Sequence, residues 1–189
     1  SDTILPMIAT DLKVGTIFKE NSHPWRVEKY AHIKSARSGA SVKVKARNLI
    51  TNEVREFSYL GGVHVEDAQV ERKNAQFLYE SNGYFFMDPQ TYDQFEISSD
   101  VLGDQAKYLK DGEMVQVMYY EGEPVSIDLP NSLVFEVTYT EPGFRGNTVS
   151  NVYKDAELDG KFTAKVPSFI SVGDKVKIDT RTGEYISKA

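Results

Sequence analysis

The chain has 189 residues, 40% of them apolar, with 22 Lys and Arg against 28 Asp and Glu, no cysteine and a formal net charge of −6. Its length suits one large domain or two to three small ones, and its composition excludes wholesale disorder, disulfides, cysteine chemistry and a uniformly basic surface for nucleic acid. No apolar run approaches the roughly 18–20 residues of a membrane span, and the segment before Met7 does not resemble a signal peptide, which makes Met7 a candidate for the native first residue.

Seven of the ten Lys and Arg residues in the first third of the chain lie in one segment. Residues 1–67 carry a net charge of +2, and seven of the eight charged residues from Arg26 to Arg47 are basic. Such a local excess of Lys and Arg is either a solvated strand face or a surface that binds a polyanion by displacing its counterions. The charge pattern alone leaves both alternatives open.

The same segment has the pattern of a β-hairpin. Residues 25–31 and 41–49 alternate in polarity and are predicted to be strands, and another strand is expected at 54–59. Small residues at 34–40 predict a turn in which Arg37 is the only large side chain near the centre. The second strand is predicted to separate apolar from basic side chains, with Val42, Val44 and Ala46 on one face and Lys43, Lys45 and Arg47 on the other.

The middle third of the chain holds all of the excess acid. Residues 68–130 carry a net charge of −8, with strands predicted at 76–79, 84–87 and 95–97. Asn82-Gly83 is a strong hairpin signal between the first two of these strands. An approximate apolar stripe predicts a helix over 101–110, which Gly112 would end, and two more strands are expected at 114–120 and 125–129.

The last third is neutral and begins after a candidate boundary at Leu129-Pro130-Asn131. Strands are predicted at 133–140, 161–166, 175–179 and 184–187, with a loop rich in Pro, Gly and Asn at 141–151. Many short strands and frequent turns predict an all-β protein, and segments of about 60 residues suit small closed barrels. We therefore expect three domains, at residues 1–67, 68–130 and 131–189.

The residue inventory does not predict an enzyme. His23, His32 and His64 lack the spacing of a zinc motif and are expected to be ordinary surface or packing residues. Neither a P-loop nor a nucleophile elbow occurs in the sequence. No catalytic residue, metal ion or cofactor is expected.

Four segments give the chain a resemblance to bacterial translation elongation factor P over essentially its whole length from Met7. They are residues 11–15 (Asp-Leu-Lys-Val-Gly), the hairpin as far as residues 45–49 (Lys-Ala-Arg-Asn-Leu), residues 139–148 (Tyr-Thr-Glu-Pro-Gly-Phe-Arg-Gly-Asn-Thr) and residues 178–185 (Ile-Asp-Thr-Arg-Thr-Gly-Glu-Tyr). The resemblance implies an SH3-like, KOW-type barrel followed by two OB-fold barrels, in an L shape similar to tRNA.

The resemblance also implies a function. Relatives bind the 70S ribosome between its P and E sites, beside the peptidyl-tRNA and the rRNA, where they stimulate peptide-bond formation and relieve stalling at consecutive prolines. They are not enzymes. The resemblance therefore implies a cytoplasmic, monomeric ribosome-binding factor without membrane association.

The resemblance assigns the hairpin tip to the neighbourhood of the tRNA CCA end and the peptidyl-transferase centre. The tip residues are Lys34, Ser35, Ala36, Arg37, Ser38, Gly39 and Ala40. Arg37 falls on the tip position, which places the chain among arginine-type relatives, either unmodified or modified by an arginine-modifying rhamnosyl transferase. Ser35-Ala36 and Ser38 stand where the family usually has Pro-Gly and Gly. Behind the tip, RNA phosphates are expected to contact the cations Lys43, Lys45 and Arg47.

In the third domain, the resemblance implies contacts with tRNA and the small ribosomal subunit. The residues concerned are Arg145, Gly146, Asn147, Thr148, Arg181, Tyr185 and Lys188. Asn147 replaces the usual Asp, which keeps hydrogen bonding but removes a charge. Tyr185 is expected to stack on RNA, with a barrel-core tyrosine as the alternative.

Three other protein classes share parts of this pattern. An elongation factor P-like paralogue would share the fold, although the C-terminal segment 179–185 favours the main factor. A module of tandem barrels that binds free RNA or an oligosaccharide would share the strand pattern. The related archaeal and eukaryotic factor five-A normally lacks a third domain, so residues 131–189 argue against it.

Overall fold

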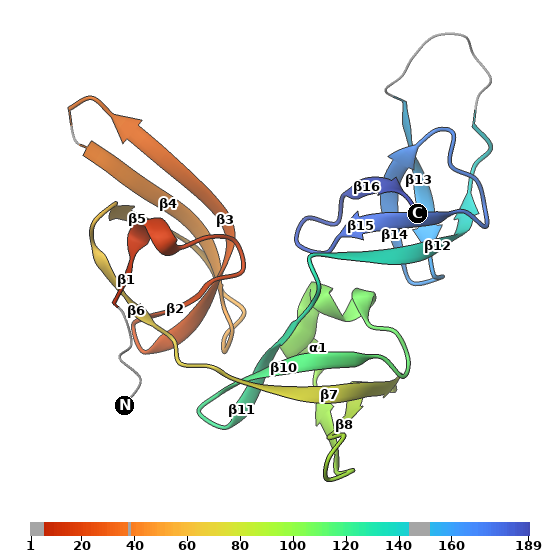
Figure 1. The fold of residues 1–189 in the computed structure, drawn as a ribbon, viewed down its shortest axis with the longest axis horizontal. Helices are drawn as coiled ribbons and strands as arrows, with labels where there is room; N and C mark the ends of the chain where they lie inside the picture. Colours follow the sequence, from red (N-terminus) through yellow and green to blue (C-terminus); the bar gives the residue numbers. More distant parts are fainter. Residues whose placement is uncertain (1–5, 38, 144–151) are drawn as a thin grey trace. The chain divides into compact units, whose positions relative to one another are not determined.

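The computed structural model of the chain describes residues 6–37, 39–143 and 152–189. They form three antiparallel sheets and a few short helical segments, so the predicted all-β class is confirmed (Figure 1). Contacts divide the chain into two compact units. One unit runs from the start of the chain to Gly103 and includes Asp111–Asp128, and the other combines Asp104–Lys110 with Leu129–Ala189.

The first sheet has six strands in the order β1-β6-β2-β3-β4-β5. Val42, Val44 and Ala46 on β4 are at most 1% exposed, which confirms their predicted inward face. They share a core with Phe18 and Trp25, whose large side chains are buried as well. The elements are β1 (Met7–Ile8), the 3-10 helix η1 (Ala9–Asp11), β2 (Ile17–Glu20), β3 (His23–Ser35), β4 (Gly39–Asn48), β5 (Val54–Leu60) and β6 (His64–Asp67).

The second sheet has five strands in the order β11-β10-β7-β8-β9. Phe77 and Phe86 are at most 1% exposed, and their ring centroids lie 5.4 Å apart. The predicted turn at Asn82 joins β7 to β8, and Asn82 has a φ of 56°, which Asn tolerates better than most residues. The strands are β7 (Glu71–Glu80), β8 (Tyr84–Met87), β9 (Gln94–Ile97), β10 (Met114–Tyr120) and β11 (Glu123–Asp128).

The helix predicted over residues 101–110 is wrong in its extent. The α-helix α1 covers only Ser99–Leu102, and the 3-10 helix η2 (Gly103–Tyr108) follows it. Gly103 has φ 51° and ψ −132°, a conformation outside the helical region, so the α-helical hydrogen-bond ladder stops there.

The third sheet has five strands in the order β14-β13-β12-β15-β16. Its core contains Phe135, Val137, Leu158, Val166 and Ile178, all at most 2% exposed. The strands are β12 (Ser132–Thr140), β13 (Tyr153–Leu158), β14 (Phe162–Pro167), β15 (Lys175–Asp179) and β16 (Tyr185–Lys188). β13 was not predicted from the sequence.

A segment from the middle of the chain completes the core of the third sheet. Tyr108 of η2 is 4% exposed and lies edge-on to Phe162, with ring centroids 5.3 Å apart. The Lys161 ammonium donates a hydrogen bond to the carbonyl of Leu109 at 2.8 Å. The three-domain division with borders at residues 67 and 130 therefore remains a proposal, in which residues 104–110 pack onto the third domain.

Candidate nucleic-acid interface

β3 and β4 form a long hairpin that extends beyond the other strands of the first sheet (Figure 1). Their pairing continues from Trp25 and Asn48 to Ser35 and Gly39. Lys34 and Ser35 therefore belong to β3, and Gly39 and Ala40 to β4, so the turn is shorter than the predicted segment 34–40. Gly39 has a φ of 77°, which favours glycine.

The turn at the end of this hairpin presents a cation. Ala36 and Arg37 are both exposed, and Ser38 lies outside the described residues. Beyond the pair Lys34 and Ala40 the hairpin is two-stranded, because β5 ends at Leu60 opposite Ser41 and Gly61 makes the last backbone bond, to the carbonyl of Ala40. The structure therefore presents Arg37 at the end of a narrow arm, as the sequence predicted for the tip.

A β-bulge at Glu28 decides which side chains of β3 face solvent. Val27 pairs with Ala46 and Lys29 pairs with Lys45, so Glu28 is the extra residue. Val27 is consequently buried, whereas Lys29, two residues later, is exposed. Without the bulge, both side chains would lie on the same face of the strand.

The outward face of the hairpin carries three lysines. Lys29 lies directly opposite Lys45, and Lys43 lies opposite Ala31. None of these lysines forms an ion pair within the described residues, although Glu56 on β5 is the other cross-strand neighbour of Lys45. Like charges placed directly opposite each other destabilise a sheet. A polyanion bound on this face would relieve that repulsion.

Arg47 differs from the lysines because it has an acidic partner in the same hairpin. Its Nε donates to Glu28 Oε1 at 2.6 Å, and its Nη1 donates to the carbonyl of Asn52 at 3.1 Å. Both charged side chains of the pair are about one-third exposed. The guanidinium is therefore held near the base of the hairpin, where one charge of the predicted basic set is balanced.

The structure describes only part of the site predicted in the third domain. Arg145, Gly146, Asn147 and Thr148 lie outside the described residues. Arg181, Tyr185 and Lys188 are all at the β15–β16 end of the chain, where Tyr185 packs partly buried against the core of the third sheet.

Both remaining cations of that site are paired with aspartates. Arg181 contacts Asp179 through two nitrogens, at 3.0 and 2.6 Å, and this hydrogen bonding lowers the pKa of the Asp179 carboxyl below its ordinary value. The Lys188 ammonium lies 2.9 Å from Asp174 and likewise lowers the pKa of that carboxyl. These cations are thus neutralised within their own domain.

The described residues do not assemble a metal site. They contain no group of three or more His, Asp or Glu side chains placed to hold a metal ion. Asn48 donates a hydrogen bond to Nδ1 of His23 at 2.9 Å, which gives this histidine a structural partner. His32 and His64 are exposed.

Across the described ranges, no helix has the length and apolarity to cross a membrane.

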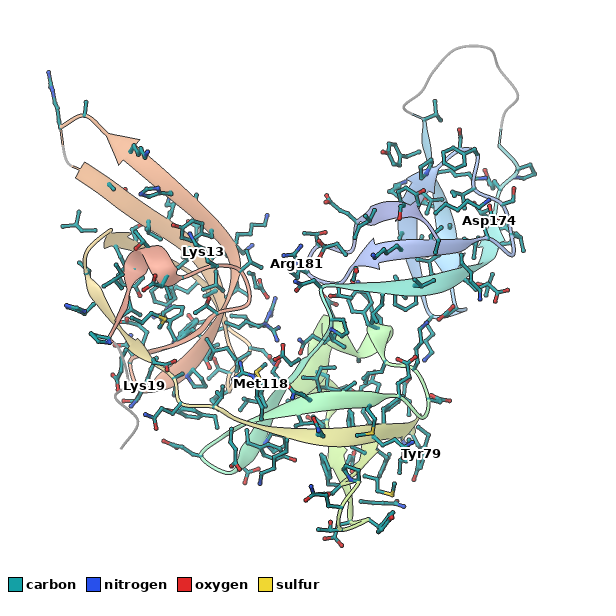
Figure 2. The ribbon with its side chains drawn as sticks, in the orientation of Figure 1. Lys13, Lys19, Tyr79, Met118, Asp174 and Arg181 are labelled. Carbon is teal, nitrogen blue, oxygen red and sulfur yellow. The ribbon has the colours of Figure 1, made fainter. Side chains whose placement is uncertain are left out.

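Two cations near the hairpin were not assigned to the site from the sequence, Lys29 on its outward face and Lys13 beside Tyr30, which packs on the inward side. Lys29 was recognised as part of the basic segment, but its place opposite Lys45 depends on the bulge at Glu28. Lys13, labelled in Figure 2, lies with its ammonium 4.3 Å from the ring centre of Tyr30 on β3, a favourable cation–π geometry. The sequence signal that could have identified Lys13 is its position within residues 11–15, one of the four segments that carry the family resemblance.

Comparison with known proteins assigns each sheet to a domain type. A family profile described as "Elongation factor P (EF-P) KOW-like domain" matches residues 8–65, one described as "Elongation factor P (EF-P) OB domain" matches residues 70–127, and one described as "Elongation factor P, C-terminal" matches residues 133–188. These matches define a multidomain translation factor. The chain belongs to the elongation factor P family.

Relatives of similar length support this assignment. The chain is 39% identical over 178 residues to elongation factor P of Persephonella marina, covering 94% of each chain. It is 39% identical over 180 residues to elongation factor P of Nitratidesulfovibrio vulgaris, covering 95% of this chain and 97% of the relative. Among solved structures, eukaryotic translation initiation factor 5A from Methanococcus jannaschii matches with a TM-score of 0.45 and 20% identity, covering 65% of this chain and 95% of that one.

Proposed function

We propose that the protein is a cytoplasmic, monomeric translation elongation factor that binds the ribosome between the P and E sites and stimulates peptide-bond formation at consecutive prolines. The observation that carries the proposal is the outward face of the β3–β4 hairpin, on which Lys29, Lys43 and Lys45 form no ion pair among the described residues. Clustered lysines of this kind bind nucleic-acid phosphates by releasing counterions. The tip then delivers Arg37 to the peptidyl-tRNA.

The proposed role of the hairpin is positioning rather than proton transfer. Proline is a slow substrate because its ring fixes φ and removes the backbone N–H. A factor that holds the peptidyl-tRNA in a reactive geometry lowers the entropic cost of alignment, and the ribosome supplies the chemistry. A guanidinium suits the tip because it stays charged and presents several donors to RNA oxygens.

The remaining proposed contacts with RNA lie on the hairpin and in the third domain. Lys34 and Arg47 add cations to the hairpin, and the C-terminal residues 145–148, with Arg181, Tyr185 and Lys188, contact the tRNA and the small subunit. Since Arg181 and Lys188 are already paired with aspartates, we expect them to contribute less to binding than the hairpin lysines.

The test is synthesis of a polyproline reporter in a translation system depleted of the factor. The purified protein is expected to restore synthesis, and Arg37→Ala is expected to lower the rate about 10- to 100-fold, the effect of losing charge-assisted hydrogen bonds. The matched control is Arg55→Ala, because Arg55 is an exposed arginine of the same sheet that pairs with Glu53 at 2.7 Å. Full activity of Arg37→Ala would remove the assigned role of the tip, and no rescue by the wild-type protein would remove the function.

Sedimentation distinguishes this function from binding of free RNA. The protein is expected to sediment with ribosomes that carry P-site tRNA and to bind isolated RNA weakly. Tight, salt-dependent binding to isolated RNA would favour the tandem-barrel RNA-binding module instead. The mass of the native peptide containing Arg37 reports whether a rhamnosyl transferase has modified it.

A further inference from the structure

A polar contact joins the base of the hairpin to the second sheet within the same compact unit, and Asn52 of the β4–β5 turn donates a second hydrogen bond to the carbonyl of Asp100 on α1 at 2.5 Å. Nη1 of Arg26, on β3, donates a hydrogen bond to Oγ of Ser126, on β11, at 2.6 Å. Ser126 is 0% exposed, although it is 100 residues away in the chain. This hydrogen bond sets a defined geometry between the Arg26 guanidinium and β11, and the Ser126 hydroxyl in turn donates to the carbonyl of Ile127 at 3.4 Å.

Charged groups of both sheets surround this contact. Burial lowers the pKa of the Arg26 guanidinium, while the charges of Glu28 and Asp128 raise it and that of Arg47 lowers it. Glu28 pairs with Arg47 at 2.6 Å and Asp128 pairs with Arg72 at 3.2 Å. Arg26 is therefore within electrostatic range of charged groups from an ion pair of the hairpin and from an ion pair of the second sheet.

Apolar side chains pack beside the polar contact. Ile17 and Leu49 of the first sheet region form one buried cluster with Met118, Tyr120 and Val125 of the second sheet. Figure 2 labels Met118, on β10. The apolar cluster holds the two sheets together without a preferred direction, whereas a hydrogen bond requires a defined geometry.

The length of the hairpin makes its base sensitive to rotation. Arg26 and Arg37 are separated by 11 residues of chain, which span about 36 Å in an extended strand. A rotation of about 5° at the base would therefore move the tip by roughly 3 Å. Misplacement by even about 1 Å can lower the rate of an aligned reaction substantially.

We infer that Arg26 is a positioning residue, which, through Ser126, fixes the direction of the β3–β4 hairpin relative to the second sheet and so places Arg37 for its task. Arg26 itself does not touch the peptidyl-tRNA. The expected effect on peptide-bond formation rests on the proposed function, whereas the effect on the direction of the hairpin does not. It predicts that loss of the contact affects where the tip lies more than whether the protein binds.

The structural part is tested by a distance distribution between spin labels. Because the chain has no cysteine, Ala36→Cys and Gln94→Cys introduce two unique and exposed labelling sites, one at the hairpin tip and one on β9. We expect Ser126→Ala to broaden the distribution at least twofold, with Arg55→Ala as the control that leaves it unchanged. A distribution as narrow as that of the wild-type pair would overturn the inference.

The functional part is tested by the rate of proline–proline bond formation against factor concentration. Ser126→Ala and Arg26→Ala are expected to lower the rate at saturating factor about 10- to 100-fold and to change the half-saturating concentration less than twofold. Arg26→Lys keeps the charge but not the forked geometry, so it is expected to be impaired as well. Thermal unfolding, followed by the fluorescence of Trp25, the one tryptophan of the chain, identifies any variant that fails to fold.

The outcomes separate this inference from the proposed function. A folded Ser126→Ala variant with an unchanged saturating rate, or one whose only defect is weaker binding, would overturn the positioning role. If the wild-type protein itself gives no stimulation, the proposed function fails, and the spin-label distances still decide whether Arg26 sets the direction of the hairpin.

Discussion

The first and third sheets each contain a directly opposed cross-strand pair with a lysine, but the partners differ in charge. In the hairpin, Lys29 lies opposite Lys45, whereas in the third sheet Asp155 lies opposite Lys165 with 2.7 Å between the charged atoms. Opposite charges in this arrangement stabilise a sheet and like charges destabilise it. The hairpin thus carries an arrangement that lowers its own stability.

The difference indicates which cations are available to a partner. In the third domain, Arg181 and Lys188 have carboxylate partners in the same chain, so an RNA phosphate must compete for them. The lysines of the hairpin face form no ion pair within the described residues, although Glu56 lies opposite Lys45 on β5, and a phosphate would remove the repulsion between Lys29 and Lys45. An acidic protein can in this way bind a polyanion through one face, because its compensated cations contribute little.

The largest effect, on ribosome binding, is expected from removing the three lysines of the hairpin face. The triple variant Lys29→Ala, Lys43→Ala, Lys45→Ala should weaken ribosome binding and lower the slope of log affinity against log salt by about 2, as expected for three lost contacts with single-stranded RNA. Binding titrations between low and moderate salt measure the slope.

The control for this prediction removes three lysines that each have a carboxylate partner, Lys19, Lys73 and Lys165. It changes the net charge by the same amount and is expected to leave the slope nearly unchanged. Equal slopes for the two triple variants would mean that net charge, rather than the hairpin face, governs binding.

A smaller effect, on the free energy of unfolding, is expected when the charge of one lysine in each opposed pair is reversed. Lys29→Glu places an acid opposite Lys45 and should stabilise the free protein by about 0.2–1 kcal/mol while weakening ribosome binding. Lys165→Glu places an acid opposite Asp155 and should destabilise the third sheet by a similar amount. Calorimetric unfolding measures both changes, and a stabilising Lys165→Glu would contradict the comparison.

The smallest expected effect is a change in how the stability of the third domain depends on pH. Because Arg181 lowers the pKa of Asp179 in the folded state, the pair stabilises the fold above the ordinary aspartate value of 3.8 and loses this contribution as the pH falls through the lower folded-state pKa. Asp179→Asn should therefore be less stable than the wild type at neutral pH, with the difference vanishing in acid. Acid-unfolding curves of both proteins measure this difference. A difference in free energy of unfolding that is the same at every pH would show that the charge of Asp179 does not cause it.

The hairpin could be predicted from the sequence because its pattern is local. The alternation of Val42 and Val44 with lysines specifies both the strand and its inward face, and the small residues around Arg37 specify the turn. The pairing of Lys29 with Lys45 could not be predicted, since it depends on a bulge at Glu28 that only the facing strand defines.

Other elements were missed or misjudged for similar reasons. β13 (Tyr153–Leu158) buries only Ala156 and Leu158, so its apolar pattern is too weak to distinguish it from a loop. The apolar stripe over 101–110 predicted one helix, but Leu102 packs in the first unit and Tyr108 in the second. The contact between Arg26 and Ser126 joins residues too far apart in the chain for any local signal.

The place of Tyr108 in the third sheet's core has a consequence for how such a chain can be shortened or recombined. A gene cut at the codon for residue 130 would leave the downstream fragment with a cavity beside Phe135 and Phe162 and would expose Tyr108 on the upstream fragment. The last domain therefore cannot be exchanged intact by joining two chains at residue 130. An exchange between relatives would have to carry residues 104–110 with it.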